Sequence, residues 1–239
     1  MSSPTPASNP RTSPQAAQVS LTERRKAATR MDIARAAAGL FVKQGLRATR
    51  AEDIAQAAGV APRTFYRYFA SKEEAVAPLY AVGAQRWTEA VAAALADLPL
   101  PQALELAVRH TLTPGRGASA ASWELVRTLI RLSDTSPALG KVWAEVCHTT
   151  EGRLAEVLAG RGGSDGSDNV GKHAAASSGH SSTQRFSAAV ASAAVRVAVE
   201  SWAAGTAPAS GPGGPAALAL RNLDALRDFP WTDLAGVVA

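Results

Sequence analysis

The residues whose types and spacing suggest chemistry lie in the segment 50–69. A short run of apolar and small residues ends at Gly59, and Pro62 opens a second short run, so two helices joined by a glycine turn fit into this segment. Phe65 and Phe69 are four residues apart and give the second helix a buried face. Its outward face, which carries no acidic residue, then consists of Pro62, Arg63, Thr64, Tyr66, Arg67 and Tyr68.

This outward face is typical of a surface that binds DNA. Arginine can read guanine edges in the major groove, and hydroxyl groups can bind phosphates. The distribution of charge agrees, since residues 1–80 hold 12 Lys and Arg against 6 Asp and Glu, whereas residues 81–239 hold 13 against 14. The alternative is a tight helical corner with a solvated basic surface and no partner.

Other constellations that could do chemistry are missing from the sequence. It contains no nucleophile beside a base, no paired buried carboxylates and no cluster of metal ligands, so we expect neither an enzyme nor a cofactor. The single cysteine, Cys147, adjoins His148 but has no second ligand pair in range, which argues against a metal site. His173 and His180 fall in a polar segment and are expected to be solvated.

Composition predicts an all-α fold. Alanine fills 53 of 239 positions, aromatic residues make up 5%, and alternating strand patterns are absent. No apolar run resembles a secretory signal or a membrane span, so we expect a soluble, cytoplasmic protein without a membrane partner.

The chain divides into an arm rich in proline (1–20), a helix-turn-helix domain (21–80), a larger helical body (81–230) with a loop rich in Gly and Ser (162–182), and a tail (231–239). The first helix is expected to begin near Leu21 and to stop at Gly45. Capping boxes are predicted at Thr49 with Glu52 and at Ser71 with Glu74, the second opening a long helix over 72–97. Further helices are expected over 102–113, 118–133 and 138–160, with two more in the last third of the chain.

From about residue 27 to 87, the chain resembles the DNA-binding domain of TetR-type (tetracycline-repressor-like) transcriptional regulators. That resemblance implies an all-helical homodimer, in which a small N-terminal domain binds DNA and a larger C-terminal domain senses a small molecule. The residues that carry it are Ile33, Ala34, Ala36, Ala37, Leu40, Phe41, Gly45, Thr49, Ile54, Ala55, Ala57, Ala58, Gly59, Val60, Thr64, Phe65, Tyr66, Tyr68, Phe69, Ser71, Lys72 and Glu73.

The resemblance also implies roles for individual residues. Arg63, Thr64 and Tyr66 would lie in or beside the groove. Thr49, Tyr68 and Lys72 would hold phosphates, Lys72 together with the free N–H groups of the helix it opens. One departure is Ala61, where family members often carry a serine that caps the helix and is worth about 1 kcal/mol. The full set of expected DNA contacts is Thr49, Arg50, Pro62, Arg63, Thr64, Tyr66, Arg67, Tyr68 and Lys72.

The helix pattern beyond residue 80 is similar to that of the subgroup whose ligands are acyl-CoA-like. A sensing pocket needs an apolar cavity with a few polar groups. Arg127 and Arg131 share a helix face and could bind a carboxylate or phosphate, or else pair with Glu124, Asp134 or a neighbouring helix. The tryptophans could instead be core anchors. The expected pocket residues are Trp87, His110, Trp123, Arg127, Arg131, Trp143 and Cys147.

The last two helices carry small and apolar residues that suit a four-helix dimer interface, and they could alternatively close the core of one protomer. The expected interface residues are Ala193, Val197, Trp202, Leu223 and Leu226. The sequence thus predicts a ligand-responsive DNA-binding regulator, a repressor rather than an activator, that binds an inverted-repeat operator as a homodimer. The competing hypothesis is an architectural DNA-binding protein without a ligand.

Overall fold

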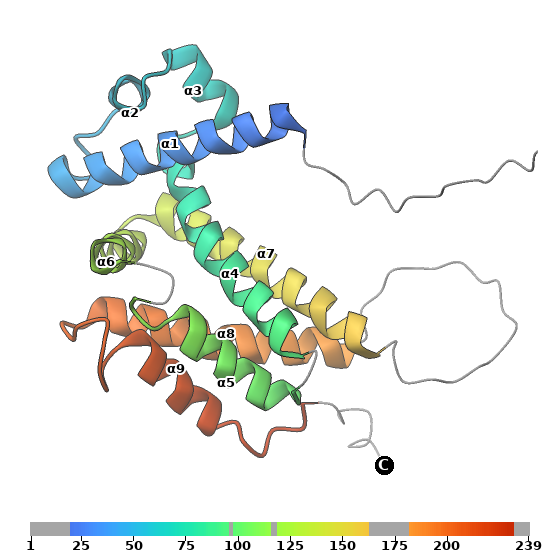
Figure 1. Cartoon of the computed structure of the whole chain (residues 1–239). Coiled ribbons are helices and arrows are strands. Elements are labelled where there is room, and N and C mark those ends of the chain that lie inside the picture. Colours follow the sequence, from blue (N-terminus) through green and yellow to red (C-terminus); the bar gives the residue numbers. More distant parts are fainter. Residues whose placement is uncertain (1–19, 96–97, 116–118, 163–181, 232–239) are drawn as a thin grey trace, which may run out of the picture.

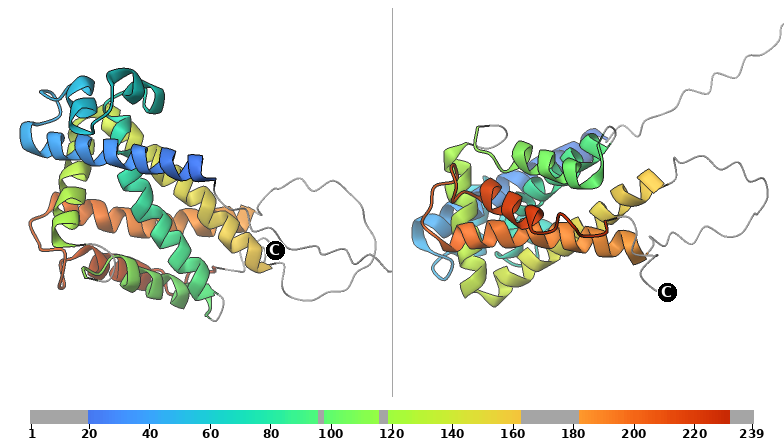
Figure 2. Two further views of the ribbon diagram at one scale, coloured as in Figure 1. Left: turned by 45° about the horizontal axis from the view of Figure 1, so that its top comes forward. Right: turned by 90° about the horizontal axis from the view of Figure 1, so that it is seen from below.

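The computed structural model describes residues 20–95, 98–115, 119–162 and 182–231. All regular secondary structure in these ranges is helical, which confirms the all-α class. Figure 1 shows α1, α2 and α3 as a small unit beside a larger bundle, and Figure 2 shows it from two further directions. The elements are α1 (Leu21–Gln44), α2 (Ala51–Ala57), α3 (Pro62–Tyr68), the 3-10 helix η1 (Glu74–Val76), α4 (Ala77–Leu95), α5 (Leu100–Thr111), α6 (Ala120–Thr135), α7 (Pro137–Gly162), α8 (Ser182–Ala204) and α9 (Pro215–Asp224).

Helix α1 begins and ends where the sequence predicts. The Ser20 hydroxyl accepts a hydrogen bond from the Glu23 N–H at 3.2 Å, which satisfies one of the free donors at the helix start. Gly45 ends the helix with φ +82°, and its N–H donates to the Phe41 carbonyl at 3.1 Å. Helices α5, α6 and α7 likewise start and stop within roughly two residues of the predicted bounds.

The capping box predicted at Thr49 is wrong by one residue. Arg50 is the N-cap of α2, and its N–H donates to the Asp53 carboxylate at 2.9 Å. The Thr49 side chain is buried and donates to the carbonyl of Gly45 at 2.8 Å. The end of α1 leaves carbonyl groups without helical partners, and the Thr49 hydroxyl satisfies one of them instead of capping α2.

The second capping box is present, but it opens a shorter element than expected. Ser71 Oγ accepts from the Glu74 N–H at 3.2 Å, and the Glu74 carboxylate accepts from the Ala70 N–H at 3.0 Å. These bonds begin η1, a 3-10 turn of the kind common at helix starts, and α4 begins only at Ala77. The predicted end of this helix, at residues 96–97, lies outside the described residues.

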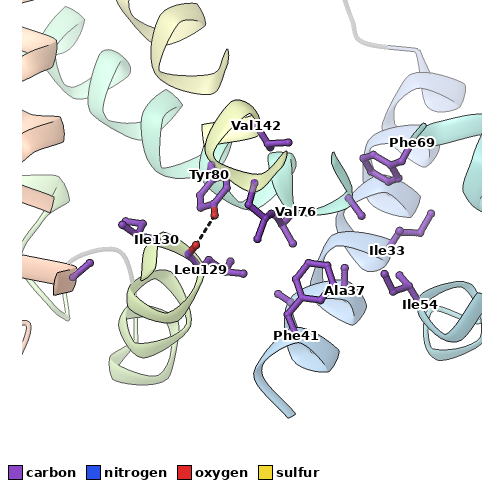
Figure 3. Packing of buried hydrophobic residues seen from close by; sticks show 14 of the residues in the cluster. Ile33, Ala37, Phe41, Ile54, Phe69, Val76, Tyr80, Leu129, Ile130 and Val142 are labelled. Atoms are coloured by element: carbon purple, nitrogen blue, oxygen red, sulfur yellow. Dashed lines mark hydrogen bonds between the residues drawn. The ribbon is translucent and has the colours of Figure 1, made fainter. Parts of the chain in front are cut away.

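One hydrophobic cluster continues from the small unit into the larger bundle. It includes Ile33 and Phe41 of α1, Val76 of η1 and Val142 of α7, as Figure 3 shows from close by. At its centre, the Tyr80 hydroxyl donates to the Leu129 carbonyl of α6 at 3.0 Å. Burial raises the pKa of Tyr80 far above its ordinary value, so the phenol remains a neutral donor. Helices α1, α4, α6 and α7 therefore share one core.

A second cluster joins the remaining parts of α4, α5, α7, α8 and α9, with Trp87, Leu104 and Leu154 among its members. Trp231 also belongs to it, and the Ser187 hydroxyl donates to the Trp231 carbonyl at 2.9 Å. The tail predicted from residue 231 therefore begins too early, because a large apolar ring at that position is buried. Residues 232–239, the arm up to residue 19 and the loop 163–181 lie outside the described residues.

Two glycine substitutions should change stability in opposite directions. Gly59 has φ +67°, so Gly59→Ala is expected to lower the free energy of unfolding by about 1–2 kcal/mol. Gly39 lies inside α1 with no atom within 4 Å of an added Cβ, so Gly39→Ala should raise it by about 0.5–1 kcal/mol. Urea unfolding of both variants measures the difference, and a shift of the same sign in both would contradict the argument.

Candidate functional site

Helices α2 and α3 form a tight corner. After α2, the N–H of Gly59 donates to the Gln56 carbonyl at 3.1 Å, and the N–H of Val60 donates to the Ala55 carbonyl at 2.9 Å. Ala61 is the N-cap of α3 and offers no side-chain bond, as its methyl group dictates. Phe65 is fully buried, so the opposite side of α3 faces solvent.

The solvent face of α3 carries the side chains that the sequence placed there. Pro62, Arg63, Tyr66 and Arg67 are exposed, and Thr64 and Tyr68 are half-buried. The guanidinium carbon of Arg67 lies 5.3 Å from the centre of the Tyr68 ring, a distance suited to a cation–π contact. The face therefore presents positive charge, a hydroxyl group and aromatic edges on one short helix.

An acidic residue of α2, which the sequence suggested only as part of a capping box, borders this face. Glu52 accepts a hydrogen bond from the Tyr66 hydroxyl at 3.3 Å, and its other oxygen lies 3.5 Å from Nε of Arg50. Desolvation, followed by the negative charge of Glu52, raises the pKa of Tyr66. Glu52 and Tyr66 are fourteen residues apart, so only the crossing of the two helices brings them together.

Two expected phosphate ligands are engaged inside the protein. The Thr49 side chain is 1% exposed and bonded to Gly45, so its hydroxyl is not presented at the surface. The Lys72 ammonium donates to the carbonyls of Leu46 and Thr49, at 2.7 and 2.8 Å. Lys72 also lies in a turn before η1, whereas the sequence predicted that it opens a helix. The charged Lys72 side chain therefore serves as a hydrogen-bond donor to the segment between α1 and α2, residues 45–50.

Lys72→Met tests this structural role. The variant leaves two carbonyls without their charged donor, so we expect the free energy of unfolding to fall by about 1.5–3 kcal/mol. Lys43→Met, at an exposed position of α1, is the matched control and should change stability by less than about 0.5 kcal/mol. If Lys72 held a phosphate instead, its loss would reduce the slope of log K for DNA binding against log salt concentration by about 0.9. The free energy of unfolding would then stay unchanged.

A cavity of about 1030 Å³ lies among α1, α4, α6, α7 and α8. Four of the seven expected pocket residues line it: Trp87, Trp123, Trp143 and Cys147. Its size is that of a site for a drug-sized molecule. Met31 and Arg35 of α1 also line the cavity, although no pattern in the sequence indicates that the first helix reaches it.

The other three expected pocket residues lie elsewhere. His110 is exposed on α5. Arg127 contacts Glu124 at 3.3 Å, donates to the Ala207 carbonyl and lies 4.2 Å from the centre of the Trp202 ring. Arg131 donates to the carbonyls of Ala203 and Gly205. The two arginines do share a face of α6, but that face meets the C-terminal end of α8, where carbonyls lack helical partners.

The α7–α8 side of the cavity carries a polar group that the sequence analysis missed. Glu200 accepts a hydrogen bond from the Trp143 indole N–H at 2.7 Å, and Arg196 donates to both of its oxygens, at 3.2 and 3.0 Å. Arg196 and Glu200 are four residues apart on α8, a spacing that could have suggested the pair.

No arrangement suited to a metal ion occurs in the described ranges, where no three His, Cys, Asp or Glu side chains come together. Burial raises the pKa of the Cys147 thiol to about 12, so the thiol is protonated near neutral pH. None of the helices in the described part of the chain is long and apolar enough to cross a membrane.

The expected dimer residues have different surroundings. Val197 is 44% exposed and Leu226 is half-buried, whereas Ala193 lines the cavity. Trp202 is 1% exposed and Leu223 is 7% exposed, so both belong to the core of the protomer. This corrects their expected position on an interface, since the Trp202 ring packs edge-on against Trp123 at 5.4 Å and is enclosed by α6 and α8.

Comparisons with known proteins match this architecture. The pattern of bacterial regulatory proteins of the tetR family matches residues 33–77. The HTH-type transcriptional regulator TcmR of Streptomyces glaucescens is 36% identical over 156 residues, which cover 62% of this chain and 67% of TcmR.

Two solved structures share the fold. Thermus thermophilus FadR, a TetR-family transcriptional repressor in complex with lauroyl-CoA, has a TM-score of 0.50 and 24% identity, covering 82% of this chain and 92% of FadR. Salmonella enterica GusR has a TM-score of 0.51 and 19% identity, covering 83% and 93% of the two chains. Since TcmR is matched over two thirds of its length at 36% identity, this chain belongs to the TetR family of transcriptional regulators, which are non-enzymatic DNA-binding proteins and generally ligand-responsive repressors.

Proposed function

We propose that the protein is a repressor that binds an inverted-repeat operator as a homodimer and leaves it when a small molecule fills the cavity. The observation that carries this proposal is the exposed cationic and aromatic face of α3 on a helix whose other side is fixed by buried Phe65. A rigid helix with such a face suits the major groove. Such a regulator acts at the chromosome, so we expect it in the cytoplasm.

The DNA contacts fall into two groups. Arg63, Thr64 and Tyr66 read base edges or lie beside them, while Arg50, Pro62, Arg67 and Tyr68 approach the backbone. Thr49 and Lys72 contribute by holding the α1–α2 connection in place, which is supported by their internal hydrogen bonds. Residues 21–80 then form the DNA-binding domain, and residues 81–230 the sensing and dimerisation domain.

The dimer forms through α8 and α9. Val197 and Phe186, at 44% and 50% exposure, supply apolar side chains on the outside of α8, and Leu226 adds to them. Two copies of these helices would make a four-helix interface, and the two α3 helices would then meet successive major grooves.

Release by a ligand is a shift between two dimer geometries. The cavity is lined by α1 as well as by α4 and α6, so a ligand in it contacts a helix of the DNA-binding unit. A differential affinity of about 1–3 kcal/mol between the two geometries changes operator occupancy about 5–150-fold. An acyl-CoA-like effector remains a prediction, because the similarity to FadR at 24% identity supports the fold alone.

Recovery of genomic fragments by the purified protein at about 150 mM salt tests the proposal. We expect a few sites that share an inverted repeat. Uniform recovery of all fragments, lost steeply as salt rises, would instead support an architectural protein that binds only phosphates.

A further inference from the structure

The helix-turn-helix segment carries mostly positive charge, and its two acidic residues have different partners. Residues 45–70 contain four arginines and, as acids, only Glu52 and Asp53. Asp53 has a structural role, because its carboxylate accepts the N–H of Arg50 at 2.9 Å at the start of α2. Glu52 instead contacts two side chains, those of Tyr66 and Arg50. An acid on a surface that meets a polyanion costs binding energy, so its position there needs a reason of its own.

The two oxygens of the Glu52 carboxylate contact two different DNA-binding groups. One oxygen accepts a hydrogen bond from the Tyr66 hydroxyl at 3.3 Å, and the other lies 3.5 Å from Nε of Arg50. All three side chains are exposed at the corner of α2 and α3 (Figure 1). In the proposed function Tyr66 lies beside the bases and Arg50 beside the backbone. Glu52 therefore connects a residue that responds to sequence with one that does not.

The contact with Arg50 weakens binding to phosphate. The Arg50 side chain is 76% exposed, so apart from Glu52 its guanidinium is open to an anion from solvent. A phosphate must compete with the carboxylate for the guanidinium and is also repelled by the carboxylate charge. Contacts with phosphate supply essentially all of the affinity for unrelated DNA. Glu52 therefore lowers non-specific binding.

The contact with Tyr66 has the opposite effect on operator binding. A hydrogen bond to an ionised acceptor is roughly twice as strong as one between neutral groups, so the carboxylate restricts the exposed phenol to one position. A side chain that is already ordered loses less conformational entropy when it binds. Tyr66 benefits only where the base pair beside it fits, which is the case on the operator.

Resting on the proposed function, we propose that Glu52 is a positioning residue that determines the ratio of operator binding to non-specific binding. Its carboxylate restrains Arg50 from phosphates on any DNA and positions Tyr66 for the bases of the operator. Loss of the charge therefore raises the affinity for unrelated DNA. On the operator this gain is offset, because Tyr66 is then held less firmly.

Glu52→Gln tests the proposal, since it removes the charge and keeps an oxygen that can accept from Tyr66. Fluorescence anisotropy of the full-length variant with a scrambled duplex should show binding about three- to fivefold tighter, the strength of an exposed ion pair. The slope of log K against log salt concentration should steepen by about 0.9, because Arg50 becomes free to displace one more counterion. Affinity for the operator duplex should change by less than about twofold, since the two effects oppose each other. Equal tightening on both duplexes would overturn the proposal.

Glu105→Gln on α5 is the matched control. The Glu105 side chain is 49% exposed against 47% for Glu52, and it likewise pairs with an arginine, Arg109, at 4.0 Å. Helix α5 lies in the larger bundle, away from α2 and α3 (Figure 1). This variant should leave the affinities and salt slopes of both duplexes unchanged. A slope as steep as that of Glu52→Gln would show that the loss of any negative charge suffices, and would overturn the proposal.

Two double variants identify the residues through which Glu52 acts. In an Arg50→Met background, Glu52→Gln should no longer steepen the salt slope. In a Tyr66→Phe background, it should tighten both duplexes alike. A slope change that persists without Arg50, or a loss of specificity that persists without the Tyr66 hydroxyl, would overturn the proposal. Urea unfolding checks the fold, and Glu52→Gln should leave the midpoint close to the native one because the side chain is exposed.

The proposed function stands or fails in a separate comparison. A native protein that binds the operator and scrambled duplexes alike would contradict a specific operator, and the scrambled duplex would still report whether Glu52 restrains Arg50. Conversely, a native protein that prefers its operator supports the proposed function. If Glu52→Gln then left affinity and slope on the scrambled duplex unchanged, the role assigned to Glu52 alone would be overturned.

Discussion

Phe65→Ala is expected to lower the free energy of unfolding by about 3–5 kcal/mol. The Phe65 ring is fully buried, meets Tyr66 edge-on at 5.3 Å and lies 5.8 Å from Phe69. It belongs to the cluster that α1, α2 and α3 share with the larger bundle, so its removal leaves a cavity where the two short helices cross. Urea unfolding followed by circular dichroism measures the loss.

The control for this prediction is an exposed apolar side chain. Leu106 of α5 is 49% exposed, and Leu106→Ala should change stability by about 0.5 kcal/mol or less. The Phe65 variant should also lose operator binding, because α3 is no longer held against α2. A variant with unchanged stability would show that the corner of α2 and α3 does not depend on this ring.

Arg63→Ala is expected to weaken binding to the operator by about 5–150-fold, or 1–3 kcal/mol, and binding to unrelated DNA far less. Arg63 is exposed on α3, where a guanidinium can donate two hydrogen bonds to a guanine edge. Fluorescence anisotropy with an operator duplex and a scrambled duplex, at one fixed salt concentration, measures both affinities.

A second arginine variant separates the effect of losing a positive charge from the effect of losing a contact with a base. Arg109→Ala removes the same charge from α5, where Arg109 is exposed and lies 4.0 Å from Glu105. It should leave the ratio of operator to scrambled binding unchanged. If Arg63→Ala weakened both duplexes equally, Arg63 would contact only phosphates.

Local signals made much of the DNA-binding unit predictable from sequence. The start of α1, the glycine stop and the solvent face of α3 depend on residues close together in the chain. Glu52 was predicted only as part of a capping box, because its contact with Tyr66 exists only after α2 and α3 cross.

The larger bundle was less predictable because contacts between distant residues determine it. The four-residue spacing of Arg127 and Arg131 correctly predicts a shared face, but spacing cannot tell which neighbour that face meets. Eighty residues separate Arg127 from its acceptor at Ala207. The position of Trp202 could not be predicted either, because a tryptophan side chain suits a dimer interface and a protein core equally well.

The position of Met31 and Arg35 on the wall of the cavity limits how modular this regulator is. A chimera that exchanges residues 1–76 with those of another family member would receive a foreign DNA-binding unit and also a foreign piece of cavity wall. Its effector preference would change together with its operator. Engineers who need to retarget the protein without altering its response should therefore replace residues of α3 alone and keep α1.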